Sequence, residues 1–93
     1  MSQSIISNEK RCLICGTTFN LHKHHIFYGS NRQRSEKDGC WVYLCAWHHN
    51  LSGHGIHFDK ELDIQVKRLC QRIWEKKLGN RQDFIEAYGR SWL

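Results

Sequence analysis

The sequence predicts an α+β fold in a single domain, residues 1–93, with a short antiparallel hairpin held by a structural metal ion and followed by two helices. Three observations predict it. The 93 residues are too few for a self-sufficient core, because a chain this short buries only roughly 60–65% of its unfolded surface. Cysteines and histidines concentrate between residues 12 and 57. Residues 59–93 instead carry apolar residues at helical spacing.

The composition excludes several classes of protein. Hydrophobic residues make up 40% and charged residues 25% of the chain, and proline is absent, which excludes a linker or a disordered chain. No apolar run approaches the roughly 18 residues of a membrane span, and residues 1–11 lack the apolar stretch of a signal peptide. We therefore expect a cytoplasmic protein that does not enter a membrane.

The first half of the chain predicts the hairpin. Residues 19–27 alternate loosely and end in Ile26 and Phe27, which favours a short strand. Residues 28–39 are polar and contain a glycine near each end, so we expect a loop there. Residues 40–44 are the second expected strand, antiparallel to the first.

The second half of the chain predicts two helices. Asp59 is a suitable N-cap, and Gly79 ends the first helix. Asn80, with Asp83 three residues later, can cap a second helix that ends at Gly89. The apolar positions of the first helix are Leu62, Val66, Leu69, Cys70, Ile73 and Trp74. Those of the second are Phe84, Ile85 and Tyr88, and residues 91–93 are expected to pack back onto both helices.

Two ligand pairs indicate a structural Zn²⁺ site. Two residues separate Cys12 from Cys15, and two separate Cys45 from His48. This spacing lets one tight turn present two ligands to the same ion. The alternative is that these cysteines are small buried hydrophobic residues.

The five cysteines are expected to be free thiols or thiolates. An odd number cannot pair completely within one chain, and the cytoplasm is reducing. Cys40 at the start of a strand and Cys70 on the apolar side of a helix are expected to pack in the core.

The remaining histidines need a separate explanation. They are His22, His24, His25, His49, His54 and His57. Neighbouring residues in a strand point in different directions, so one of His24 and His25 can bind an ion while the other accepts a proton. His49 directly follows a zinc ligand and is expected to project away from the zinc.

In these motifs the chain resembles the HNH endonucleases, and within that superfamily most closely the small bacteriophage enzymes with a structural zinc. The motifs are Cys-x2-Cys, His-His-Ile, Leu-Cys-x2-His-His and a later His, and they cover about residues 12–58. The resemblance implies a ββα-metal core (His-Me finger), two strands and a helix around one divalent ion. The helical part, about residues 59–93, would follow this core.

The resemblance also implies roles for single residues. His24 would bind the divalent ion and His25 would be the general base. His49 and His57 would be further ligands of the ion, with His54 as the alternative to His57. The middle Asn of the family has no counterpart in residues 40–44, and Asn31 and Asn50 are the candidates to replace it.

The implied activity is metal-dependent hydrolysis of DNA phosphodiester bonds, with Mg²⁺, Mn²⁺, Ni²⁺ or Zn²⁺ as the active-site ion and 5′-phosphate products. If the protein is encoded by a phage, it would act in the cytoplasm of the bacterial host. One alternative is a non-catalytic, zinc-stapled nucleic-acid-binding or adaptor module whose histidines are structural. Another is an interaction domain that contacts phage replication or recombination proteins through its C-terminal helix and Trp92.

The basic residues suggest how DNA would be bound. Arg32, Arg34 and Lys37 lie in the expected loop beside the general base, where they can contact phosphates. Tyr28 can either stack on a base or anchor the turn. A second basic group is expected on the outer side of the first helix, as a solvated face or as a contact for the DNA backbone. It consists of Lys67, Arg68, Arg72, Lys76 and Lys77.

Overall fold

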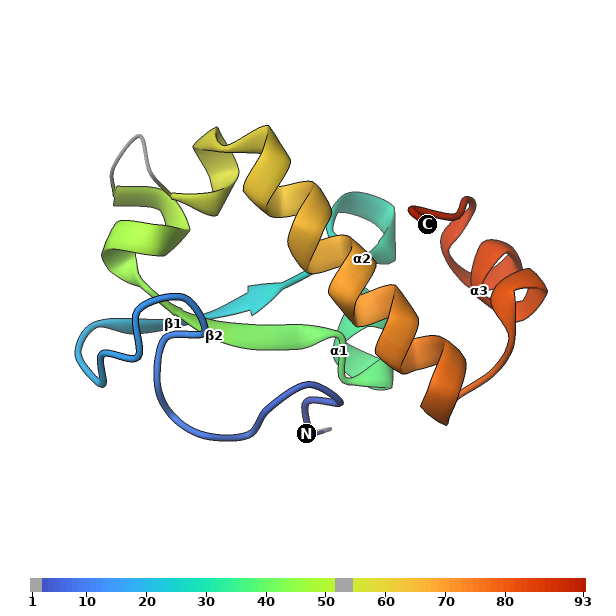
Figure 1. Ribbon diagram of the computed structural model, residues 1–93, viewed down its shortest axis with the longest axis horizontal. Coiled ribbons are helices and arrows are strands. Elements are labelled where there is room, and N and C mark those ends of the chain that lie inside the picture. Colours follow the sequence, from blue (N-terminus) through green and yellow to red (C-terminus); the bar gives the residue numbers. More distant parts are fainter. Residues whose placement is uncertain (1–2, 52–54) are drawn as a thin grey trace.

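The computed structural model describes residues 3–51 and 55–93 and has an α+β fold built on a two-stranded antiparallel sheet (Figure 1). β1 (Leu21–His25) pairs with β2 (Trp41–Cys45), so that Leu21 faces Cys45 and His25 faces Trp41. The predicted hairpin is confirmed, although β1 is shorter than expected and β2 is displaced by one residue. β1 begins directly after Asn20, whose positive φ of 53° belongs to a turn.

The segment expected to be a loop, residues 28–39, is instead helical. A 3-10 turn, η1 (Gly29–Asn31), leads into the helix α1 (Arg32–Asp38). α1 has no apolar stripe and buries only Ser35, so hydrophobic periodicity could not reveal it. It ends at Gly39, whose φ of 79° lies in the left-handed region.

Two short helical turns follow β2. η2 (Trp47–Leu51) is a π-helical turn and η3 (Ile56–Phe58) is a 3-10 turn. The resemblance implies one helix after the two strands, whereas the described residues before Asp59 form these two turns. Ile56 is buried and anchors η3 in the core.

The two C-terminal helices are confirmed. α2 (Lys60–Lys77) begins at Asp59, whose side chain accepts a hydrogen bond from the backbone N–H of Leu62. α3 (Arg81–Tyr88) begins with the expected capping box between Asn80 and Asp83. α2 runs obliquely across the hairpin, and α3 lies at one end beside the C-terminus (Figure 1).

The buried face of α2 differs from the expected stripe. Leu69 is 38% exposed, whereas Asp63, Lys67 and Gln71 are buried. The placement of Lys67 on the outer side was therefore wrong. Its ammonium binds the carboxylate of Asp63 at 2.7 Å and lies 4.5 Å from the ring centre of Trp92, and these contacts compensate the loss of hydration.

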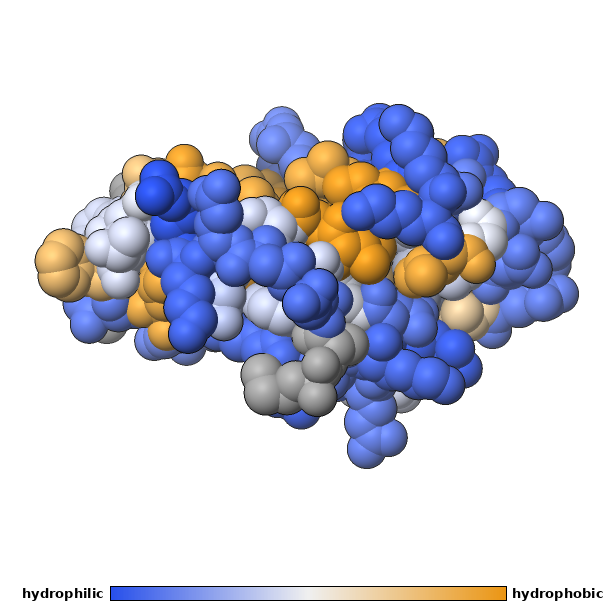
Figure 2. Space-filling view, turned by 90° about the horizontal axis from the view of Figure 1, so that it is seen from below, coloured by the Kyte–Doolittle hydropathy of each residue, from blue (hydrophilic) through white to orange (hydrophobic). Residues whose placement is uncertain are grey.

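The core lies between the hairpin, α2 and α3. Its fully buried side chains are mainly apolar and include Ile26, Leu44 and Phe84. Cys40 and Cys70 are also fully buried, as predicted. The face seen in Figure 2 is mostly hydrophilic around a hydrophobic area near its middle. None of the helices among the described residues is long and apolar enough to cross a membrane.

Both ends of the described chain are fixed to this core. The hydroxyl of Ser4 donates to the carbonyl oxygen of Trp41 at 2.6 Å, which holds the N-terminal segment beside β2. The backbone N–H of Trp92 donates to the side chain of Gln71 at 2.7 Å. The expectation that residues 91–93 pack onto the helices is confirmed, and Trp92 is partly buried against the core.

Candidate metal centres and active site

The four residues predicted to bind zinc lie together. One ligand atom from each of Cys12, Cys15, Cys45 and His48 lies within 4.8 Å of the others. The sulfurs of Cys15 and Cys45 are 3.8 Å apart, and the sulfur of Cys12 is 3.8 Å from Nδ1 of His48. Tetrahedral Zn²⁺ with thiolate bonds of about 2.3 Å separates its sulfur ligands by roughly 3.8 Å. This set can therefore hold a metal ion such as zinc.

Electrostatics favours a cation in this cluster. Burial opposes ionisation of the Cys12 thiol, but bonds from the backbone N–H groups of Cys15, Cys45 and Ile14 outweigh it and lower its pKa to about 6. The pKa of Cys15 is raised: the backbone N–H of Thr17 lowers it, but burial and the sulfurs of Cys12 and Cys45 prevail. A divalent cation would relieve the repulsion between these sulfurs.

The other cysteines have a structural role. None of the five cysteines, all within the described residues, forms a disulfide. Cys70 has a raised pKa because of its hydrogen bond to Cys40 and its burial, and the hydroxyl of Tyr88 contacts the sulfur of Cys40 at 3.5 Å. Cys70 therefore stays a neutral thiol, and both cysteine side chains pack in the core.

Three further histidines form a second cluster. Single ring nitrogens of His24, His49 and His57 lie within 4.8 Å of one another. Nε2 of His49 is 3.0 Å from Nε2 of His57, which fits two nitrogens bound to one ion at about 2.0–2.1 Å as well as a hydrogen bond between the rings. The structure brings together the three histidines named from the resemblance, whereas His54 lies outside the described residues.

The orphaned nitrogen of His24 indicates a missing ligand at this cluster. His24 on β1 is 2% exposed, and its buried Nε2 has no hydrogen-bond partner among the described residues. Burial, followed by the charges of His49 and His57, lowers its pKa to about 3. Burial and the charges of His57 and His22 lower the pKa of His49 to about 4. Both imidazoles are thus neutral near pH 7, which is the form that binds metals.

His22 contacts the second cluster through His49. Its Nδ1 lies 2.9 Å from Nδ1 of His49, on the side of the ring opposite to the nitrogen that faces His57. Such a hydrogen bond fixes the tautomer and orientation of a ligating imidazole. His22 therefore orients His49.

His25 has a different environment from its neighbour His24. Its Nε2 lies 2.9 Å from a carboxylate oxygen of Glu36 on α1, and Glu36 also binds the ammonium of Lys23 at 2.6 Å. Nδ1 of His25 has no hydrogen-bond partner in the described part of the chain. The hydrogen bond from Lys23, then that from His25, lowers the pKa of Glu36 to about 2.

A hollow of about 210 Å³ lies between His25 and the three histidines of the second cluster. Its lining includes His25 together with all three residues of the second cluster. The side chain of His25 is 9% exposed, so it is in contact with this hollow while largely packed in protein. Arg32 at the start of α1 and Tyr28 complete one side of the hollow.

Ser35 on α1 bonds to the segment that follows β1 and to the residue that precedes β2. Its hydroxyl accepts a hydrogen bond from the backbone N–H of Phe27 and donates to the carbonyl oxygen of Cys40. Asn31, proposed as a replacement for the family's middle Asn, instead donates to the carbonyl oxygen of Tyr88 and holds η1 to α3. Asn50 is exposed.

The structure separates the basic residues of α1. Arg32 lines the histidine hollow, whereas Arg34 and Lys37 line another hollow of about 300 Å³ along α1. All three side chains are exposed. Tyr28 is anchored through its hydroxyl, which donates to Asp63 and accepts from Lys67, each at 3.2 Å.

Comparison with known proteins gives no relative. No family model, curated protein or solved structure matches this chain. The assignment of function therefore depends on the geometry of the site itself.

Sequence reasoning missed three residues around the site: Lys23 on β1, and Ser35 and Glu36 on α1. The polar composition of residues 28–39 concealed the helix α1. The helix-ending signal was present in Gly39 after a basic last turn at Lys37. Placing α1 beside β1 from that signal would have brought a carboxylate close to His25.

Proposed function

We propose that this protein is a metal-dependent endonuclease of the HNH type that hydrolyses DNA phosphodiester bonds. The arrangement would be a zinc-stapled ββα-metal core, in which Cys12, Cys15, Cys45 and His48 hold structural Zn²⁺. His24, His49 and His57 would hold the active-site ion. Free cysteines and the lack of a membrane-spanning helix among the described residues are compatible with a cytoplasmic protein.

One observation carries the proposal: two adjacent imidazoles of β1 have unlike environments at one hollow. His24 presents an unpartnered, buried nitrogen to two other histidines. His25 has one nitrogen on Glu36 and leaves the other without a partner among the described residues. A metal-assisted hydrolysis needs these two roles, because one group must bind the ion and another must accept the proton of the attacking water.

The residues around His25 would prepare it as a base. When Glu36 accepts a hydrogen bond from Nε2–H, Nδ1 keeps its lone pair and can take a proton from water. Lys23 holds the carboxylate of Glu36 in place through bonds to both of its oxygens, at 2.6 and 2.9 Å. Arg32, at the edge of the hollow, can bind a phosphate oxygen of the substrate.

A divalent ion held by the three histidines would neutralise charge on the phosphate and on the departing oxygen. An all-imidazole donor set suits Zn²⁺ or Ni²⁺ better than Mg²⁺, which prefers oxygen ligands. Among Mg²⁺, Mn²⁺, Ni²⁺ and Zn²⁺, we therefore expect Zn²⁺ and Ni²⁺ to bind most tightly.

The test is nicking of supercoiled plasmid with each of Mg²⁺, Mn²⁺, Ni²⁺ and Zn²⁺, followed on a gel. We expect the wild type to cleave and His25→Ala to lose roughly a hundredfold or more in rate, the usual range for a general base. His25→Ala should keep its fold and one tightly bound zinc per chain, measured by circular dichroism and metal analysis. Cys12→Ser, by contrast, should lose zinc and unfold.

The adaptor alternative predicts a different result. The wild type would then bind DNA without cleaving it, with any of the four ions. Equal cleavage by the wild type and His25→Ala would show that His25 is not the base.

A further inference from the structure

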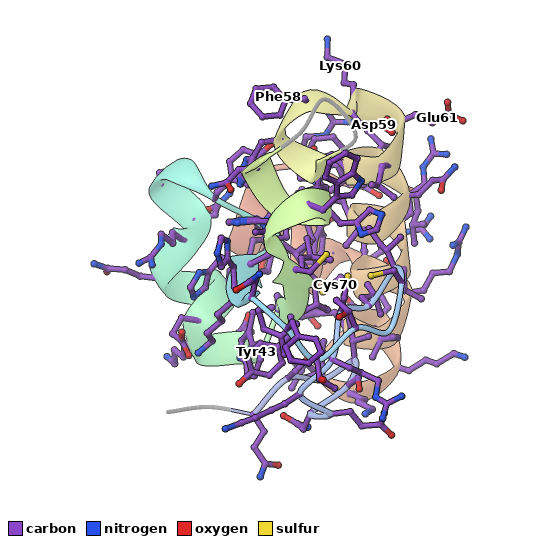
Figure 3. All side chains as sticks on the ribbon, turned by 90° about the vertical axis from the view of Figure 1, so that its left-hand side faces the viewer. Tyr43, Phe58, Asp59, Lys60, Glu61 and Cys70 are labelled. Atoms are coloured by element: carbon purple, nitrogen blue, oxygen red, sulfur yellow. The ribbon has the colours of Figure 1, made fainter. Side chains whose placement is uncertain are left out.

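A second hollow, lined in part by exposed aromatic side chains, adjoins the histidine hollow. It measures about 260 Å³, and Tyr28 and His57 line both hollows. Phe58 and Lys60 lie on its rim, and in Figure 3 both project outward near the start of α2. A strand whose phosphate lies at the histidines would therefore pass its next nucleotide over this surface.

The fold exposes Phe58 for a structural reason. Ile56 is 2% exposed and fills the core side of η3, whereas Phe58 is 66% exposed. The backbone before η3 lies close to that of η2, and only a glycine fits there. A Cβ at Gly55 would lie 2.8 Å from the carbonyl oxygen of His49. The ring of Phe58 thus remains in solvent directly after the ligand His57.

Tyr28 provides a second, rigid ring on the same surface. It is 47% exposed, and its ring centre lies 6.2 Å from that of His57. The two hydrogen bonds of its hydroxyl, to Asp63 and from Lys67, orient it before any ligand arrives. Lys60 is exposed and has no ionic partner among residues 3–51 and 55–93, so it can bind a phosphate.

We infer that this surface binds an unpaired nucleotide, so that the substrate is DNA with a single-stranded segment at the cleavage site. Aromatic rings beside a cation are the features that recognise unstacked bases, whereas the bases of an intact duplex are stacked on each other. This inference rests on the proposed DNA cleavage at the histidine hollow and names its substrate class.

The test measures binding separately from cleavage. His25→Ala protein is titrated with two oligonucleotides containing 2-aminopurine, one single-stranded and one fully paired, and the fluorescence of the base analogue is followed. We expect quenching with the single strand, and Phe58→Ala in the same background to weaken single-strand binding roughly ten- to a hundredfold. Duplex affinity should change less than twofold.

Two further variants sharpen the test. Phe19→Ala is the matched control, because Phe19 is 75% exposed and belongs to neither hollow. It should bind as the parent does. Phe58→Trp keeps an aromatic plane and should restore single-strand binding to within a few-fold of the parent, whereas Phe58→Leu should not.

The inference is overturned if Phe58→Ala binds the single strand as tightly as Phe19→Ala does, or if it weakens duplex binding equally. These results do not depend on catalysis. A wild type that never cleaves, but whose single-strand binding depends on Phe58, would refute the proposed nuclease activity and leave the binding surface established.

Discussion

At the scale of single residues, the feature that distinguishes this site is the carboxylate of Glu36. It contacts both Lys23 and His25, at 2.6 and 2.9 Å, and links β1 to α1. The two contacts explain why its pKa is lowered to about 2. Because the ion pair is partly exposed to solvent, its main effect is to orient His25 and only secondarily to stabilise the fold.

This lowered pKa predicts how stability depends on pH. The folded protein keeps Glu36 ionised between its ordinary pKa, near 4.5, and about 2, whereas the unfolded chain takes up a proton there. The stabilisation is therefore present above pH 4.5 and is lost as the pH falls through about 2. Urea unfolding of the wild type and Glu36→Gln should show a difference in unfolding free energy that shrinks below pH 4.5. A difference independent of pH would mean that the carboxylate charge does not stabilise the fold.

At the same scale, the spacing in the sequence predicted which cysteines and histidine form the first cluster. Short spacings within the chain define the pairs Cys12–Cys15 and Cys45–His48, and the structure brings them together. The partner of His25 could not be predicted, because it depends on how α1 packs on β1. Lys67 was misplaced for a similar reason, since its neutralisation by Asp63 and its contacts with two rings are tertiary features.

At the scale of elements, α1 is the helix that the apolar pattern and helix propensity of the sequence could not predict. α2 and α3 were predictable because they combine apolar spacing with caps at Asp59 and Asn80. α1 has seven residues and buries only Ser35, so its stability depends on tertiary contacts and on Gly39 at its end. The same contacts place Glu36 beside His25.

Gly39→Ala is expected to destabilise the protein more than Gly89→Ala. Both glycines end a helix with positive φ, 79° and 90°, so each alanine costs roughly 1–2 kcal/mol of backbone strain. A Cβ at Gly39 would also collide with the carbonyl oxygen of Gln3, whereas nothing lies within 4 Å of one at Gly89. Thermal unfolding followed by circular dichroism measures both variants. Equal losses of stability in the two variants would show that the N-terminal segment around Gln3 moves away from the new Cβ at no cost in free energy.

At the scale of the whole molecule, the excess of positive charge predicts how DNA binding depends on salt. The formal net charge is +5, and Arg34 and Lys37 line one hollow along α1. If both bind phosphates of a duplex, Arg34→Gln with Lys37→Gln should reduce the slope of log affinity for duplex DNA against log salt concentration by about 1.8. Lys10→Gln with Arg11→Gln removes the same charge elsewhere and should leave the slope nearly unchanged. Fluorescence anisotropy at four salt concentrations measures both, and equal slopes would exclude Arg34 and Lys37 from the interface.

The ligands of the two candidate metal centres meet in one peptide unit, because His48 belongs to the first set and His49 to the second. A shift of the His48 backbone also shifts His49, because the planar peptide keeps their Cα atoms about 3.8 Å apart. If the cysteine cluster holds Zn²⁺, its replacement by a larger thiophilic ion such as Cd²⁺ would move His48 outward and shift His49 with it. The size of an ion at the cysteine cluster would then affect where the ring of His49 lies in the histidine cluster.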